Sequence, residues 1–152
     1  ILTYGGEKKL LATSSGVNSR LNVYSGLDSV TSCSSSLNFV GGTITAAHLP
    51  IGAAQLADGN VYVRYQFTSA PAIVRYTFDG SSLAGATTVF NDSSILNNTI
   101  SDKGLAALDA TNLLFGNWAT DAVYKFDTAT SSVGFFARDA YTTDVNAIAI
   151  RP

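Results

Sequence analysis

The sequence predicts an all-β chain built from three blade-like repeats, each a four-stranded antiparallel unit. In each repeat an apolar strand, a polar break and a strand ending near a tyrosine follow one another, and these tyrosines are Tyr24, Tyr76 and Tyr124. They recur about every 50 residues, a spacing typical of proteins made of stacked structural repeats. Turn-forming residues punctuate the chain, including 13 glycines. No segment carries a helical pattern between start and stop signals over the ~10–12 residues of an ordinary helix.

The first repeat covers about residues 7–47. We expect its second strand at 10–13, its third at 20–24 and its outer strand at 37–40, because these runs are apolar and lie between polar turns. Only residues 1–4 precede the second strand, so the innermost strand of this repeat is incomplete.

The second repeat covers about residues 51–98. Its innermost strand, 51–56, is rich in small residues, which suits a strand close to a crowded axis. The next strand, 61–65, alternates aliphatic with aromatic or charged residues, a pattern typical of a half-buried strand. A third strand at 73–78 and an outer strand at 86–90 complete the unit.

The third repeat covers about residues 104–142 and has the same order of elements. Its strands are expected at 104–108, 113–116, 122–126 and 133–137. In the second and third repeats alike, the third strand ends in Phe-Asp and is followed by a polar turn and Ser-Ser. This shared sequence motif is the most specific part of the repeat.

Residues 122–130 resemble the strand-and-turn phrase of bacterial extracellular β-propellers of the YVTN, PQQ-like and SMP-30/lactonase-like kinds. Residues 146–152 resemble the inner-strand phrase that precedes a turn in the same proteins. The resemblance covers most of the chain at the level of repeats and implies a partial β-propeller. The alternative fold is a two-sheet β-sandwich of the pilin or adhesin type, whose strands have the same residue patterns.

Residues 145–152 form a final apolar strand, and no further strand follows them in the sequence. Typical propellers have four to eight blades, so we expect the single domain, residues 1–152, to be completed by further chain or by another copy. We expect the final strand to close the ring or to be exchanged between copies, because a free apolar strand edge is sticky. The side chains expected to mediate this assembly are Val145, Ala147, Ile148, Ala149 and Ile150.

Composition indicates where such a protein works. Charged residues make up 13% of the chain, about half the ~25% of an average globular protein. Serine, threonine, asparagine and glycine therefore cover the surface, which favours a secreted or cell-surface protein. The incomplete repeat, rather than the composition, predicts a homo-oligomer or pairing with another segment of the same polypeptide. The net charge of −2 argues against nucleic-acid binding, and no apolar run approaches the ~18–20 residues of a membrane span.

Trp118 is the feature that points to a ligand. It lies in a predicted loop of the third repeat between Asn117 and Asp121. A tryptophan ring can stack on a sugar while polar neighbours bond its hydroxyls, and the competing interpretation is a tryptophan packed between blades. A lectin-like, glycan-binding protein is therefore one alternative function.

The second alternative is a lactonase-like propeller hydrolase, which the resemblance implies. Such propellers hold a divalent metal at the central channel, and Asp58 and Asp109 occupy matching ends of the inner strands. The competing interpretation is that aspartates cap turns. The only histidine, His48, and the only cysteine, Cys33, have no partners typical of a metal site or catalytic triad. The sequence thus favours a structural or binding module over an enzyme, and predicts no cofactor.

Overall fold

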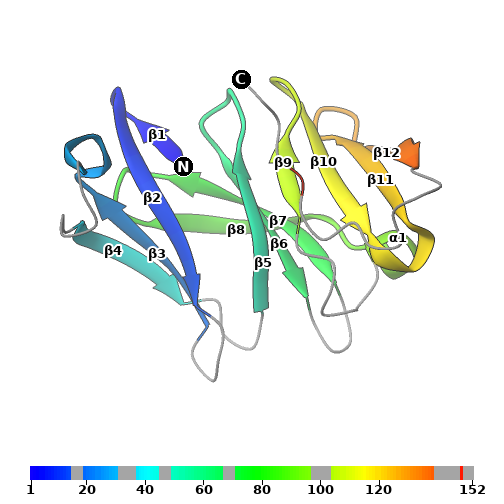
Figure 1. Ribbon diagram of the computed structural model, residues 1–152, viewed down its shortest axis with the longest axis horizontal. Helices are drawn as coiled ribbons and strands as arrows, with labels where there is room; N and C mark the ends of the chain where they lie inside the picture. Colours follow the sequence, from blue (N-terminus) through cyan, green and yellow to red (C-terminus); the bar gives the residue numbers. More distant parts are fainter. Residues whose placement is uncertain are drawn as a thin grey trace.

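The computed structural model describes residues 1–14, 19–30, 37–44, 49–66, 71–96, 104–138 and 148, without the side chains of residues 14, 43, 44 and 118. The described strands form three four-stranded antiparallel sheets that follow one another along the chain (Figure 1). Helical structure is limited to the short segments η1 (Leu27–Ser29), α1 (Ser93–Leu96) and η2 (Trp118–Thr120). The predicted all-β class and the three four-stranded antiparallel units are confirmed.

The first sheet has the order β1-β2-β3-β4. Its strands are β1 (Leu2–Tyr4), β2 (Glu7–Ser14), β3 (Arg20–Ser25) and β4 (Asn38–Ile44). Gly5 and Gly6 join β1 to β2, both with positive φ (57° and 82°), as a two-residue hairpin turn of matching twist requires. The chain's own first residues therefore provide an innermost strand, paired with Glu7–Lys9. The prediction for residues 145–152 lies outside the described residues, apart from Ile148, which is half-buried and not in a strand.

The second sheet has the order β5-β6-β7-β8. Its strands are β5 (Leu49–Gln55), β6 (Val61–Gln66), β7 (Ala72–Phe78) and β8 (Leu83–Phe90). All six residues of β6 are buried, so the prediction of a half-buried strand is wrong. The reason is that other sheets cover both of its faces, which the alternation of residue types within one strand does not reveal.

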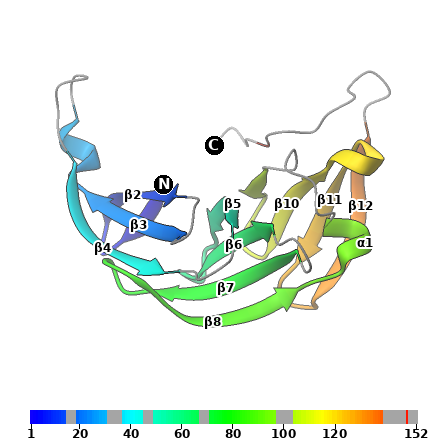
Figure 2. The same cartoon turned by 90° about the horizontal axis from the view of Figure 1, so that it is seen from below.

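The third sheet repeats this order as β9-β10-β11-β12. Its strands are β9 (Leu105–Ala107), β10 (Asn112–Asn117), β11 (Ala122–Asp127) and β12 (Ser132–Arg138). Figure 2 shows the three sheets side by side along a curve, with β5 towards its concave side and β8 on its convex side.

Two apolar cores hold the sheets together, one at each face of the middle sheet. The first core joins the first and second sheets, and the second core joins the second and third. Members of the first include Leu2, Leu21, Val23, Val61, Val63, Val74, Tyr76 and Phe78. Members of the second include Tyr62, Ile73, Leu96, Leu113, Phe115 and Phe126. Along β6 and β7, alternate residues therefore point to opposite neighbours, as the two-residue period of a strand requires.

Gln55 adds a polar connection between the first two sheets. Its side-chain amide donates to the backbone oxygen of Thr3 at 3.0 Å, and its carbonyl oxygen accepts from the backbone nitrogen of Thr3 at 2.6 Å. The side chain thus pairs with the free backbone N–H and C=O groups of Thr3 on β1, as a neighbouring strand would.

All three outer strands carry a register shift where they pair with the third strand of their sheet. The shifts lie at Val23/Tyr24 in β3 and at Val123/Tyr124 in β11. In β7 one of the two shifts spans Tyr76, between Arg75 and Thr77. An extra residue bends the outer strand and increases its twist. The recurrence of this irregularity beside the repeated tyrosine shows that the repeat extends to backbone detail.

Gly41 of β4 marks a close approach of the first and second sheets at their outer edges. A Cβ atom there would lie well inside contact distance of the backbone oxygen of Ser81. We expect Gly41→Ala to lower the free energy of unfolding by about 1–3 kcal/mol, because a backbone oxygen cannot rotate away and the sheets must separate. Urea denaturation followed by circular dichroism measures this change.

Gly134 of β12 provides the matched control, because a Cβ atom there meets nothing within 4 Å. Gly134→Ala should change the free energy of unfolding by less than about 0.5 kcal/mol. Equal effects of the two substitutions would contradict the close packing at Gly41.

Candidate functional site

The segment between β10 and β11 carries the predicted glycan-binding residues. Asn117 ends β10 and is 0% exposed. Its amide nitrogen donates to the backbone oxygen of Ile95 at 2.7 Å, and its side-chain oxygen accepts from the backbone nitrogen of Thr120 at 3.3 Å. Both polar atoms of Asn117 therefore hold α1 and η2 in place, and neither faces solvent for a sugar. Trp118 begins η2, and its side chain lies outside the described residues.

Asp121 is the third member of that predicted site and directly precedes β11. Its backbone has a φ of 50°, which is uncommon for a residue other than glycine. Its Oδ1 atom is buried and has no hydrogen-bond partner within the described part of the chain. Of the two polar residues predicted to bind a glycan, Asp121 alone thus retains an unused acceptor.

The two aspartates predicted to hold a metal both close turns between an inner strand and the next. Asp58 accepts from the backbone and side-chain nitrogens of Asn60 at 2.9 and 2.7 Å. Asp109 accepts from the backbone nitrogens of Thr111 and Asn112 at 3.0 and 2.9 Å. The bond from Thr111 is the main cause that lowers the pKa of the Asp109 carboxyl.

These bonds are the ones a turn-capping aspartate makes. Over the residues that the structure describes, no three histidine, cysteine, aspartate or glutamate side chains gather in a group that could hold a metal ion. His48 and Cys33 lie outside the described residues.

Aspartates also close the turns between third and outer strands, at matching positions of two sheets. Asp79 accepts from the backbone nitrogens of Ser81 and Ser82 at 2.9 and 2.7 Å, which lowers the pKa of its carboxyl. Asp127 accepts from the backbone nitrogen of Ala129 at 2.8 Å. The repeated aspartates are thus part of the architecture of the repeat.

Arg64 is the feature that the sequence analysis missed. It lies in the middle of β6 and is 1% exposed. Its guanidinium donates to three backbone oxygens, those of Gly104 (3.2 Å), Gly116 (2.8 Å) and Leu96 (2.9 Å), and its Cζ atom lies 5.5 Å from the centre of the Phe115 ring. A planar group with five donors suits such convergent acceptors. The only signal in the sequence is one arginine within an otherwise uncharged strand.

A tyrosine pair forms the polar part of the first core. The hydroxyl oxygens of Tyr65 and Tyr76 lie 2.8 Å apart, and both side chains are buried. Burial is the main cause that raises the pKa of each hydroxyl above its ordinary value. Each side chain therefore stays neutral in the folded protein at a pH where an exposed tyrosine ionises.

This pair predicts a loss of stability at alkaline pH. The pKa of each hydroxyl in the folded state lies above its unfolded value of about 10. The stabilisation that the neutral tyrosine pair provides is therefore fully present below pH 10 and is lost as the pH rises through and above that value. The double variant Tyr65→Phe/Tyr76→Phe should therefore lose less stability between about pH 9 and pH 11 than the unmodified chain. Denaturant titrations across this range measure the difference. Tyr4→Phe, at an exposed tyrosine, is the control, and a slope equal to that of the double variant would contradict the assignment.

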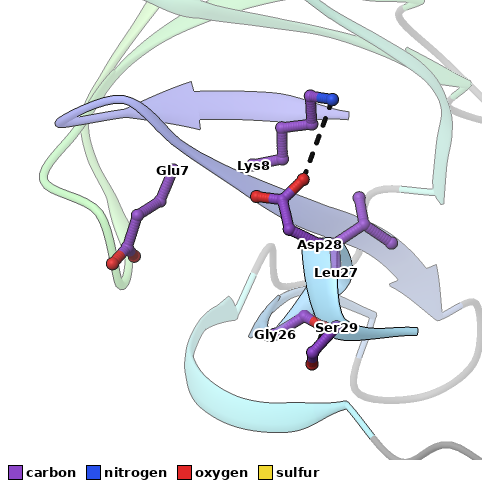
Figure 3. A pocket seen from close by; sticks show the side chains of 6 residues that line it. All are labelled: Glu7, Lys8, Gly26, Leu27, Asp28 and Ser29. Atoms are coloured by element: carbon purple, nitrogen blue, oxygen red, sulfur yellow. Dashed lines mark hydrogen bonds and ion pairs between the residues drawn. The ribbon is translucent and has the colours of Figure 1, made fainter. Parts of the chain in front are cut away.

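A surface hollow of about 210 Å³ lies beside η1 and is lined by Glu7, Lys8, Gly26, Leu27, Asp28 and Ser29. In Figure 3 the Lys8 ammonium reaches towards Asp28 across the hollow, while Glu7 points away from them. The ion pair measures 3.7 Å and both side chains are largely exposed, so its contribution to stability is on the order of 0–1 kcal/mol. None of the described residues that line the hollow carries a buried polar side chain, so the hollow does not support a specific ligand site.

Apolar side chains are exposed on the outer strands of both terminal sheets. Phe39 and Val40 lie on β4, and Phe135 and Phe136 lie on β12. The outer strand of the middle sheet, β8, exposes only small residues along its centre. Exposed apolar side chains in groups typically mark interaction sites, so the outer strands β4 and β12 are the candidate interaction surfaces.

Comparison with known proteins finds no protein-family model that matches the chain and no matching curated protein. No helix among the described residues has the length and apolar character needed to cross a membrane.

Proposed function

We propose that the chain is a β-propeller segment that serves as a structural and binding module outside the cell or at its surface, and that it associates with further sheets through its two terminal sheets. The observation that carries this proposal is the unequal covering of the three sheets. Among the residues that the structure describes, both faces of the middle sheet are packed against a neighbour, whereas each terminal sheet packs through one face only.

The stacking of the sheets supports a propeller-like arrangement over a two-layer sandwich. The inner strand β5 contacts both β1 and β9, and the outer strands β4 and β8 contact each other. Like strands therefore lie next to like strands. This order can be extended by further sheets at either end, and closure of such a row gives the ring of a propeller.

The first sheet supports the predicted role of the final strand. β1 pairs only with Glu7–Lys9, and no described strand pairs with residues 10–14 on the side of β2 away from β3. We propose that residues 145–152, of the same chain or of another copy, occupy this edge, because an open backbone edge invites pairing with another strand.

The other two functions find less support. The metal-dependent hydrolase would need Asp58 and Asp109 as ligands, but their oxygens accept turn hydrogen bonds. The glycan site would need Asn117, whose side chain is buried and bonded. A structural and binding module is therefore the function best supported by the described side chains.

Small-angle X-ray scattering tests the proposed arrangement. Under dilute conditions, where the chain is monomeric, we expect the profile of a flattened, curved row of three sheets. The profile of a compact two-layer sandwich would overturn the proposal. Gel filtration at the same concentration verifies the mass of 15.9 kDa.

A further inference from the structure

The far face of the third sheet, which points away from the second sheet, carries a deeply buried leucine. Leu113 and Phe115 of β10 point into the second core, so Leu114 between them points to the far face. The described chain has no further sheet beyond the third (Figure 2). Leu114 is nevertheless 5% exposed, and it belongs to neither of the two cores.

The second sheet shows what such burial requires. Asn60 and Asn112 hold equivalent positions, because the backbone oxygen of each accepts from the backbone nitrogen of a leucine at the end of the inner strand, at 3.1 and 2.8 Å. Two residues further on, Tyr62 and Leu114 are therefore equivalent. Tyr62 is 2% exposed because the third sheet covers it in the second core. Leu114 has the burial of a residue that lies beneath a following part of the chain.

A polar atom on the same face supports this interpretation. Asn112 lies two residues before Leu114 on β10, so the two side chains share the far face. The side-chain nitrogen of Asn112 bonds to both carboxylate oxygens of Asp109 at 2.9 Å. Its Oδ1 atom is buried and accepts no hydrogen bond within the described part of the chain. The cover of this face therefore lies over an apolar side chain and an acceptor that can still take a hydrogen bond.

The segment 97–103 starts and ends on the opposite face of the third sheet. Leu96 and Gly104 flank it, and the backbone oxygens of both accept from the Arg64 guanidinium, at 2.9 and 3.2 Å. This guanidinium lies beside the Phe115 ring, in the core between the second and third sheets. The earlier segments outside the described residues connect strands of the first two sheets. None of these segments leads to the far face of the third sheet.

The remaining segment is the C-terminal tail, residues 139–152, which follows β12. After β4 and β8, the outer strands of the first two sheets, the chain passes to the next sheet on the far side of the one it leaves. The same course after β12 takes the tail to the far face of the third sheet. Ile148, the one residue of the tail that the structure describes, is half-buried, as expected of a residue packed on the rest of the protein.

We infer that the C-terminal tail folds back over Leu114 and covers the far face of the third sheet of its own chain. The tail then competes with any further sheet for this face, as the terminal caps of repeat proteins do. Association through the third sheet therefore requires the tail to move aside, a consequence that rests on the proposed function. The pairing of residues 145–152 with β2 that is proposed above likewise belongs to the displaced state of the tail.

A single cysteine tests the cover. In a Cys33→Ser background, which removes the only native cysteine, Leu114→Cys should react with a thiol reagent at least about tenfold more slowly than Thr87→Cys, at an exposed position on β8. The rate should not change between about 1 and 100 µM protein, because the cover belongs to the same chain. A rate equal to that of Thr87→Cys would overturn the inference, and so would protection that grows with concentration, which assigns the cover to a second copy. Val123→Cys, half-buried on the same face, is the second probe if Leu114→Cys does not fold.

Ile148→Asp in the full chain tests which segment forms the cover. A charge in a half-buried contact is costly, so we expect the tail to be displaced and the labelling of Leu114→Cys to accelerate at least about tenfold. Leu113→Cys, in the second core, should stay protected. Ile1→Asp, the same substitution at a residue that is 77% exposed, is the matched control and should change neither rate. Unchanged protection of Leu114→Cys in the Ile148→Asp variant would overturn the inference.

Sedimentation velocity of Ile148→Asp in the otherwise unmodified chain separates this inference from the proposed function. Association that is stronger than in the unmodified chain supports both. Accelerated labelling without stronger association confirms the cover and excludes the proposed association through the third sheet. Association of the Ile148→Asp variant without accelerated labelling supports the proposed module and removes the cover.

Discussion

Replacement of Arg64 by methionine is expected to lower the free energy of unfolding by about 2–4 kcal/mol. Methionine fills a similar volume but donates no hydrogen bond, so three backbone oxygens in the second core lose a donor. Each buried acceptor left without a partner costs about 1–3 kcal/mol, part of which is offset because a buried charge is removed. Chemical denaturation followed by circular dichroism measures the change.

The neighbouring strand provides the control for Arg64. Arg75 on β7 is exposed, and Arg75→Met should change stability by less than about 0.5 kcal/mol. Arg64→Lys distinguishes the effect of the positive charge from that of the planar guanidinium. A lysine keeps the charge but not the planar fork of donors, so it should recover only part of the loss. Equal stabilities of the Arg64→Met and Arg75→Met variants would contradict the role given to Arg64.

Phe126→Ala is expected to have the largest effect of any single core substitution discussed, about 3–5 kcal/mol. Phe126 is 0% exposed in the second core, and its ring centre lies 5.3 Å from that of Phe90. Its removal leaves a cavity between two β-sheets, whose backbones cannot easily collapse into it. The same denaturation measurement, at protein concentrations too low for association, reports the loss.

Phe136→Ala is the matched control on the adjacent strand, because Phe136 is 48% exposed. Its effect should be below about 1 kcal/mol, since only part of its surface is removed from water on folding. If the two substitutions destabilise the protein to a similar extent, the third sheet does not pack on the second as described.

The strands could be predicted from the sequence because their signals are local. Alternating apolar residues and Asp-containing turns define β7 and β11 without knowledge of what covers them. Gly5-Gly6 was also a local hairpin signal, and it would have identified β1 as the innermost strand of the first sheet. The extent of burial of β6 could not be predicted, because it depends on both neighbouring sheets.

The roles of individual side chains in the candidate site depend on distant parts of the chain. The sequence alone predicts Asn117 to be a polar loop residue. In the structure its buried amide nitrogen donates a hydrogen bond to the backbone oxygen of Ile95, 22 residues earlier. Arg64 bonds to oxygens 32 to 52 residues later. Sequence spacing carries no information about such contacts, whereas the turn-capping role of Asp58 and Asp109 follows from their immediate neighbours.

The partners of Arg64 also set an order for folding on the ribosome. All three oxygens belong to residues that are synthesised after Arg64, the last being Gly116. Until that residue emerges, the guanidinium lacks these three acceptors in full and the second face of the middle sheet stays exposed. The first two sheets can therefore pack while the chain is still growing, since domains form from the N-terminus during synthesis. Arrival of β10 then buries Arg64 and joins the third sheet to the second.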